Sequence, residues 1–355
     1  MASTPDLDTT SHTTLDPVFP LPHVSLPPMY VFSLVVKVLT CILGLPGNVL
    51  VIYITSRLMQ PSANAAWCQG LAVADLAFIF TLPFSATYLS LGHHWPFGNV
   101  LCKLISSLAV ISMVTSSFTL ALISLDRCLS VLRPIWSQNH RGQGIARKAC
   151  LLSCATALLL SLPTWVFRKT VVRSDSTVAC HQIFLLPSEE AQQSQAEEEE
   201  YLRLLWVAQS RMTGVLVSQV VLGFLLPILT MMACYTLIGL QLRTLGRRRG
   251  WARPFGVMGT VVMAFMICLL PLQVLKLMVI ASPMSPSVPQ VVKLGLPLAS
   301  SLVYLNSCLN PLLYLVLGGG LRTGLRRRSL CKALKWALTD EPTSERTVSH
   351  RETSL

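Results

Sequence analysis

Seven long apolar runs constrain this chain more than any other feature of its sequence. They cover about residues 30–54, 67–91, 100–125, 148–167, 212–242, 255–281 and 291–317. Each run is long enough to cross the ~30 Å hydrocarbon core of a bilayer as a helix. Of the 355 residues, 52% are hydrophobic and 12% are charged, against roughly a quarter charged in soluble domains. The sequence predicts an all-α membrane protein, a seven-transmembrane helix bundle.

The basic residues predict how this bundle is oriented. The net charge of +12 could suggest nucleic acid as a partner, but Lys and Arg lie in short clusters between the apolar runs. Bases gather after the third and fifth runs and after the seventh, for example at 247–249 and 326–328, whereas acids gather after the fourth run. Because cytoplasmic loops carry an excess of Lys and Arg, we expect an extracellular N-terminus, a cytoplasmic C-terminus and no nucleic-acid partner.

Two cysteines, Cys102 and Cys180, then face the oxidising side of the membrane. Such a pair predicts a disulfide that ties the loop after the fourth run to the third helix; the alternative is two unpaired thiols. The same loop carries four consecutive glutamates at 197–200. An acidic run of this kind is either a solvated, mobile spacer or a ligand contact, and the spacer is the commoner case.

The segments outside the bundle also have distinct patterns. Residues 1–29 form the predicted extracellular N-terminus, and the bundle spans 30–317. In 318–338 leucines alternate with bases, as in an amphipathic helix on the inner leaflet. Within it Cys331 is either palmitoylated or a plain thiol. Residues 339–355 are polar and predicted to be disordered, and they end in a Ser/Thr-x-apolar pattern that either binds a PDZ protein or occurs by chance.

An acid and an arginine, Asp126 and Arg127, stand side by side where the third apolar run stops. An ion pair is costly to place at a membrane boundary. We therefore expect the pair to have a function, and we interpret it as a switch at the membrane edge.

Polar residues inside the apolar runs match the pattern of a known family. In chain order they are Gly47-Asn48-Val49, Leu71-Ala72-Val73-Ala74-Asp75, Asp126-Arg127-Cys128, Pro227 with Tyr235, Phe265 with Cys268 and Pro271, Asn306, and Asn310-Pro311-Leu312-Leu313-Tyr314. The set resembles the rhodopsin-like G-protein-coupled receptors over residues 30–338. This resemblance implies a plasma-membrane receptor that couples to a heterotrimeric G protein and to arrestin, and it implies no enzymatic activity.

Stretches 91–98, 124–128 and 133–141 look like the chemoattractant branch of that family. The nearest resemblance is to the chemoattractant-type prostaglandin D(2) receptors. It implies a chemotaxis receptor for an anionic lipid mediator of prostaglandin D(2) or related eicosanoid type, coupled to inhibitory G proteins. Two alternatives stay open. One is a receptor for a chemoattractant peptide, and the other is a weakly signalling scavenging receptor, because Leu269 and Cys154 replace tryptophans that are usual in the family.

The resemblance also names candidate ligand contacts. Arg168 matches an arginine that contacts the ligand carboxylate, and Lys276 lies a little over one turn beyond the helix-6 proline. Further bases add positive charge near the mouth of the bundle: Lys37, Lys169, Arg173, Arg211 and Lys293. Desolvated cations need a counter-charge, so we expect an anionic ligand. For Lys37 and Lys293, snorkelling to the outer headgroups is an equal alternative.

Three pocket positions depart from the prostaglandin relatives. Gln219 stands where those receptors have a lysine, Leu272 where they have a tyrosine, and Ile105 where they have a histidine. These differences leave the identity of the acidic ligand open.

Asp75 has to face the bundle interior, because an ionised group at mid-bilayer costs about 2.5–3.5 kcal/mol on insertion scales. Ser116, Asn306 and Asn310 lie at compatible depths. In the family such a cluster holds an allosteric sodium ion, and the resemblance implies the same here. The alternative is a hydrogen-bonded polar cluster without an ion.

The family resemblance also assigns the predicted switch. It implies that Asp126 holds Arg127 in the inactive state and that Arg127, Tyr235 and Tyr314 meet the G protein on release. Prolines at 227, 271 and 311 each remove a backbone hydrogen bond and kink a helix, which would give the bundle pivots.

Overall fold

The computed structural model describes residues 27–193, 197–244, 252–281 and 288–317. Seven helical spans in this part of the chain are long and apolar enough to cross a membrane, so the predicted seven-helix architecture is confirmed. The segments predicted for 318–338 and 339–355, with Cys331, lie outside the described residues, as does most of 1–29. Their predictions therefore stay predictions.

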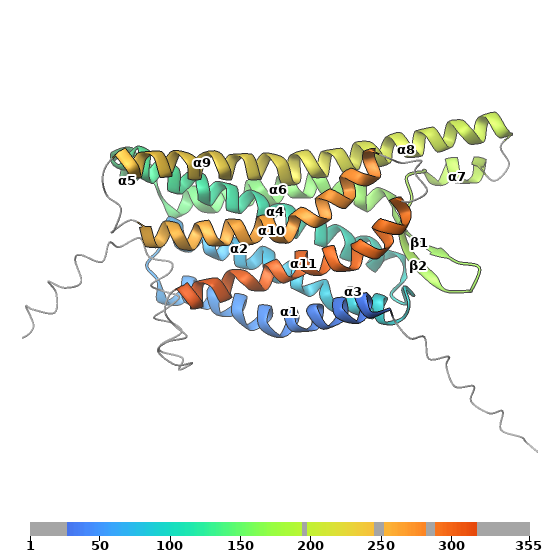
Figure 1. Ribbon diagram of the computed structural model, residues 1–355, viewed down its shortest axis with the longest axis horizontal. Coiled ribbons are helices and arrows are strands. Elements are labelled where there is room, and N and C mark those ends of the chain that lie inside the picture. Colours follow the sequence, from blue (N-terminus) through green and yellow to red (C-terminus); the bar gives the residue numbers. More distant parts are fainter. Residues whose placement is uncertain (1–26, 194–196, 245–251, 282–287, 318–355) are drawn as a thin grey trace, which may run out of the picture.

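The chain runs through the following elements (Figure 1). They are α1 (Pro28–Tyr53), η1 (Ile54–Leu58), α2 (Ala63–Phe80), α3 (Leu82–Ser90), α4 (Gly98–Leu132), α5 (Pro134–His140), α6 (Gln143–Phe167), β1 (Arg168–Val172), β2 (Val178–Gln182), α7 (Pro187–Gln193), α8 (Glu198–Val220), η2 (Val221–Leu225), α9 (Leu226–Thr244), α10 (Ala252–Ala281) and α11 (Val288–Leu317). Each of η1 and η2 is a π-helical turn that continues its neighbouring helix.

Helix α4 does not end at residue 125 as predicted, and it carries Asp126 and Arg127 inside its last two turns. Charge does not stop the helix because the acid finds guanidinium partners there. The helix ends instead at Arg133, its C-cap. Arg133 precedes Pro134, and a residue before proline avoids the helical region.

Helix α8 begins at Glu198, well before the predicted boundary at residue 212. Three glutamates occupy its first turn, where carboxylates stabilise the positive end of the helix dipole. Residues 198–200 are thus helical and not an irregular loop, and they are exposed, as the interpretation of a solvated acidic run predicts. Together α8, η2 and α9 form one span of 47 residues, about 70 Å at 1.5 Å per residue. This span projects beyond the other helices at the end where the β-hairpin lies (Figure 1).

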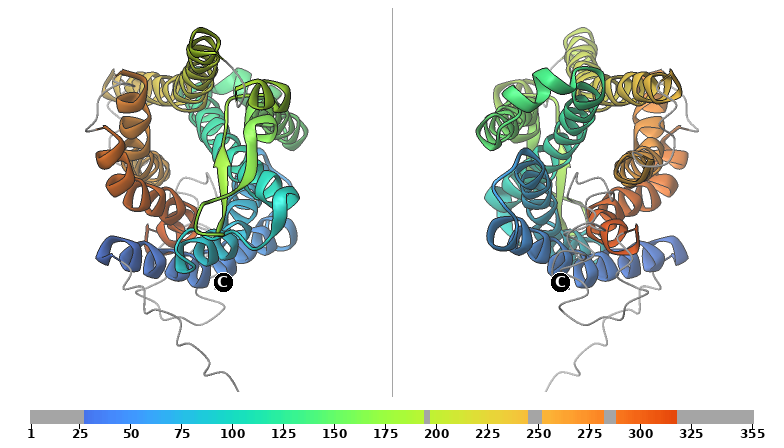
Figure 2. Two further views of the ribbon diagram at one scale, coloured as in Figure 1. Left: turned by 90° about the vertical axis from the view of Figure 1, so that its right-hand side faces the viewer. Right: turned by 90° about the vertical axis from the view of Figure 1, so that its left-hand side faces the viewer.

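The β1–β2 hairpin lies across one end of the helix ring (Figure 2). Its strands are antiparallel, with Thr170 opposite Cys180. Cys180 forms a disulfide with Cys102 in the second turn of α4, which confirms the predicted disulfide. The bridge ties the hairpin to the bundle, and we call this end of the molecule the hairpin end and the opposite end the Asp126 end.

The helices form a ring around a common core (Figure 2). Helix α4 packs against α2, α6 and α9, while α11 packs against α1 and α10. The core contains fully buried Leu71, Leu120, Met231, Phe265 and Leu269. Helix α6 exposes five leucines: Leu151, Leu152, Leu158, Leu159 and Leu162. An apolar surface of this extent is abnormal for a soluble monomer and is what a lipid-facing helix requires.

Two of the predicted pivot prolines, Pro271 and Pro311, lie inside α10 and α11. The third, Pro227, lies in the first turn of α9, directly after the π-helical turn η2. A π-helical turn shifts the register of the backbone hydrogen bonds. The helix can therefore continue through a residue that has no N–H to donate.

Helices α1 and α11 approach each other closely at Gly47. A Cβ atom at this position would lie 2.8 Å from Cγ and 3.0 Å from Cβ of Pro311. A proline ring cannot rotate away as a flexible side chain would. Gly214 in α8 gives a matched contrast, since a Cβ there would meet nothing within 4 Å.

We expect Gly47→Ala to lower the free energy of unfolding by about 1–3 kcal/mol, the usual cost of overpacking. Gly214→Ala should leave stability unchanged or raise it slightly, because alanine favours a helix more than glycine. Thermal unfolding of both variants in detergent measures the difference. Equal melting temperatures would contradict the close packing of α1 on α11.

Candidate functional site

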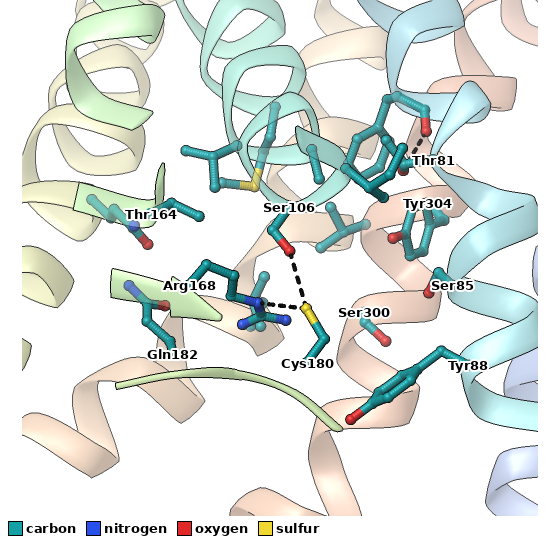
Figure 3. Close-up of a pocket in the computed structure, with 18 of the residues that line it drawn as sticks. Thr81, Ser85, Tyr88, Ser106, Thr164, Arg168, Cys180, Gln182, Ser300 and Tyr304 are labelled. Carbon is teal, nitrogen blue, oxygen red and sulfur yellow. Dashed lines mark hydrogen bonds between the residues drawn. The ribbon is translucent and has the colours of Figure 1, made fainter. Parts of the chain in front are cut away.

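A cavity of about 310 Å³ opens inside the hairpin end of the bundle (Figure 3). Its size falls within the range of small-molecule pockets. The walls come from α2, α3, α4, α6, β1, β2, α8, α10 and α11. The structure brings together five predicted pocket residues around this cavity: Ile105, Arg168, Gln219, Leu272 and Lys276.

Lys276 enters the cavity from α10 and donates a hydrogen bond from Nζ to Oε1 of Gln219, at 3.0 Å. No carboxylate pairs with it among the described residues. An amide oxygen satisfies one of the three ammonium protons and leaves the positive charge uncompensated. Both residues were predicted to lie in the pocket, but their pairing was not predicted.

Arg168 is the first residue of β1, directly after α6, and points toward the middle of the cavity (Figure 3). Its Nε lies 3.3 Å from Sγ of Cys180, so the disulfide holds the guanidinium in place. Burial lowers the pKa of Arg168 from its ordinary value, with Tyr88 and Tyr304 acting in the opposite direction. An arginine still keeps its charge at neutral pH.

Other predicted bases near the mouth are already paired. Lys169 forms an ion pair with Glu190, and Arg211 forms a bidentate pair with Glu189 at 2.6 and 2.9 Å. Both acids lie in the short helix α7. These bases therefore fasten the loop to the bundle and are not free to bind a ligand. The pKa of Glu189 is lowered, chiefly by its hydrogen bond from Arg211.

Of three other predicted residues, two have side chains that the structure does not describe and one is buried. Lys293 and Tyr314 belong to α11, but their side chains lie outside the described part of the structure. Lys37 does not snorkel to the headgroups; its side chain is buried inside the bundle.

At the Asp126 end, the acid has two basic partners. Arg127 Nη2 lies 3.3 Å from Oδ2 of Asp126. Arg141, which follows α5, donates from Nε to both carboxylate oxygens at 3.0 Å and approaches Oδ2 with Nη2 at 2.8 Å. Arg141 also hydrogen-bonds Asn64 of α2. Arg141 was not predicted as this partner, because it lies beyond the end of α4 and after α5, and only the fold brings it back to Asp126.

Tyr235 lies on α9 at its contact with α10. A Cβ atom at Gly259 would lie 3.7 Å from Cε1 of the tyrosine, so the ring fills the space where the two helices meet. Below it, α4 and α9 share a small apolar cluster that includes Cys128 and Ile238. Tyr235 is therefore placed to respond if α9 and α10 separate.

Asp75 lies buried at mid-bundle, as predicted. Ser116 donates to its Oδ1 at 3.3 Å and Asn310 donates to its Oδ2 at 2.7 Å. The Oδ1 of Asn306 is also buried and finds no hydrogen-bond partner among the described residues. Oxygen donors of this kind suit a hard cation, so the cluster fits sodium. Asn48 bonds backbone carbonyls of Gly44 and Ser307 instead.

Comparisons with known proteins agree with this geometry. The profile of the family described as 7 transmembrane receptor (rhodopsin family) matches residues 47–314. Chemerin-like receptor 1 of Rattus norvegicus is 38% identical over 81% of this chain and 76% of its own length. The C3a anaphylatoxin chemotactic receptor of Oncorhynchus mykiss is 37% identical, over 84% and 77%. Prostaglandin D2 receptor 2 of Rattus norvegicus is 32% identical, over 87% and 73%.

The unequal partners of Asp126 lead to a prediction about stability. A double-mutant cycle of Asp126→Asn with Arg141→Gln should give a coupling energy of about 1.5–3 kcal/mol, as expected for charge-assisted hydrogen bonds. The matched cycle with Arg127→Gln should give less, because Nη2 of Arg127 lies 3.3 Å from the carboxylate, against 2.8–3.0 Å for the nitrogens of Arg141. Unfolding in detergent measures both couplings. A larger coupling to Arg127 than to Arg141 would contradict the geometry.

Proposed function

We propose that this chain, which belongs to the rhodopsin family of seven-transmembrane receptors, is a chemoattractant receptor for an anionic ligand. Its relatives imply a multi-pass plasma-membrane protein that couples to a G protein. The observation that carries the proposal is a pair of cations, Arg168 and Lys276, that enter one cavity and whose partners among the described residues are neutral.

The chemistry of the cavity supports a carboxylate-bearing ligand. A guanidinium and an ammonium both form strong hydrogen bonds with a carboxylate, and apolar residues such as Phe78, Met113 and Val303 line the space beside them. This combination suits a lipid acid of the eicosanoid type. The names of the relatives add a second candidate, because one refers to prostaglandin D2 and another to the C3a anaphylatoxin. A chemoattractant peptide that presents its C-terminal carboxylate is therefore the alternative.

The proposal places the hairpin end outside the cell. A disulfide persists in an oxidising compartment, which supports an extracellular position for Cys102 and Cys180. The bases at 247–249 and 326–328 support a cytoplasmic position for the opposite end. Inhibitory heterotrimeric G proteins and arrestin would then bind at the Asp126 end, as the resemblance to the chemoattractant branch implies.

Ligand binding would activate the receptor through a movement of α10. A ligand carboxylate at Lys276 pulls on the helix a little above Pro271, and Leu269 and Phe265 lie below it, fully buried in the same core cluster. Movement of α10 separates it from Tyr235 on α9. Arg127, once released from Asp126, reaches the G protein. Asp75, Ser116, Asn306 and Asn310 would hold a sodium ion that stabilises the inactive arrangement.

A weakly signalling scavenging receptor is the second candidate function. Its support is Leu269, which fills less space in the core than the tryptophan usual in the family and so moves its neighbours less when α10 shifts. Cys154 in α6 is a further departure. Under this reading the ligand pocket is unchanged, and only the response at the Asp126 end is reduced.

We expect Arg168→Ala and Lys276→Ala each to weaken binding of the anionic ligand by about 10- to 100-fold, the loss of one charge-assisted hydrogen bond. Lys169→Ala is the matched control, because the next residue of the strand points away from the cavity and pairs with Glu190. A screen of acidic lipids and chemoattractant peptides, read by inhibition of cyclic AMP, identifies the ligand. Unchanged affinity in both cavity variants would refute an anionic site.

Arg127→Ala should abolish ligand-stimulated nucleotide exchange on purified inhibitory G protein while ligand binding persists. The reason is that the arginine lies at the Asp126 end, away from the cavity. Robust exchange in this variant would show that the switch is assigned to the wrong residue. Weak exchange in the unchanged protein, with tight ligand binding, would favour the scavenging receptor.

A further inference from the structure

Lys37 is a charged residue in the middle of the apolar helix α1, and it is buried. Only 5% of its surface is exposed. Its Nζ donates a hydrogen bond to Oγ of Ser85 at 3.0 Å and lies 5.6 Å from the centroid of the Tyr304 ring. Within the described ranges no carboxylate pairs with it.

Position along the helix excludes an anchor at the lipid headgroups. Lys37 lies about 14 Å along the axis from the first residue of α1, at 1.5 Å per residue. A snorkelling lysine keeps its ammonium in water at the membrane surface. Here the ammonium instead reaches Ser85 on α3 and Tyr304 on α11, inside the bundle.

Neutral partners do not compensate this charge. A serine hydroxyl satisfies one of the three ammonium protons, and the face of an aromatic ring attracts a cation without neutralising it. Tyr304 is itself held by stacking on Phe78, with ring centroids 4.6 Å apart. A buried charge without a counter-charge is costly, so this arrangement leaves room for an anion to stabilise it.

Both partners of Lys37 belong to the ligand cavity. Ser85 and Tyr304 line it, and they lie on the opposite side from Arg168 (Figure 3). The hydroxyl of Ser300 lies on the same side. The cavity therefore has a cationic side built by β1 and α10, and on its other side Ser85 of α3 and Tyr304 of α11 stand between the cavity and Lys37 of α1.

We propose that Lys37, Ser85 and Tyr304 form a second anion subsite, and that the ligand carries two acidic groups separated by an apolar chain. The first acid binds Arg168 and Lys276, and the second displaces the Ser85 hydroxyl as the partner of Lys37. This inference rests on the proposed function, because it assigns a ligand class to the same cavity. A second acidic group would explain why the protein buries a third cation, which a ligand with one carboxylate does not need.

Matched lipid acids test the subsite. The full chain in nanodiscs is titrated with dodecanedioic acid and with dodecanoic acid, which have the same chain length and differ in the second carboxylate. Affinity is read from the shift of the melting temperature. We expect the unchanged protein to bind the diacid about tenfold more tightly than the monoacid. Lys37→Met should remove this difference and leave monoacid affinity unchanged, whereas Lys276→Met should weaken binding of both acids.

The outcomes separate this inference from the proposed function. If Lys37→Met keeps the full preference for the diacid while Lys276→Met loses both acids, the subsite is wrong and the anionic pocket stands. If neither acid binds the unchanged protein, the subsite and the lipid-acid class both fail. Lys37→Gln serves as a second variant should Lys37→Met not fold; it removes the cation but keeps a polar group beside Ser85, and it should also lose the preference for the diacid.

Discussion

The cost of burying charge in a membrane protein governs both ends of this molecule. At one end Asp126 meets two guanidinium groups, Arg127 and Arg141, so its charge is compensated inside the protein. At the other end, within the residues that the structure describes, the partners of Lys276 and Lys37 are an amide, a hydroxyl and an aromatic face. A buried ammonium with neutral partners is unfavourable. The first set of charges is paired within the protein, and the second set fits the proposal that these lysines bind an anionic ligand.

The core between the two ends can connect them mechanically. Leu269 and Phe265 of α10 are buried in one cluster with residues of α4 and α9. Because the side chains of a protein core are closely packed, they do not deform continuously but change between discrete arrangements. A shift of α10 at the cavity therefore has to be accommodated at the contacts of α10 with α9, where Tyr235 lies. The disulfide holds the hairpin to α4, and the ion pair of Arg211 holds α7 to α8.

The hydropathy of the sequence was sufficient to predict the helix bundle, because an apolar run of this length can satisfy its backbone hydrogen bonds in a bilayer only as a helix. The family motifs placed Asp75 with Ser116 and Asn310, since these residues occupy fixed depths on their helices. The predicted end of the third helix at residue 125 and the predicted start of the fifth at residue 212 were wrong. A hydropathy profile ends a helix at charged residues, whereas such residues continue a helix when ion-pair partners or the helix dipole stabilise them. Pairings that depend on side-chain direction across helices, such as Lys37 with Ser85, also escaped prediction. Two lysines in apolar helices look alike in sequence whether they face lipid, a cavity or a carboxylate.

The melting temperature of the ligand-free protein tests the account most directly. Replacing Lys276 and its partner together, as Lys276→Met with Gln219→Leu, removes the buried charge without leaving a polar group unpaired. If the charge is uncompensated in the empty cavity, the double variant melts a few degrees higher than the unchanged protein. A lower melting temperature would contradict the account, because it would mean that the cation already has a stabilising partner within the protein.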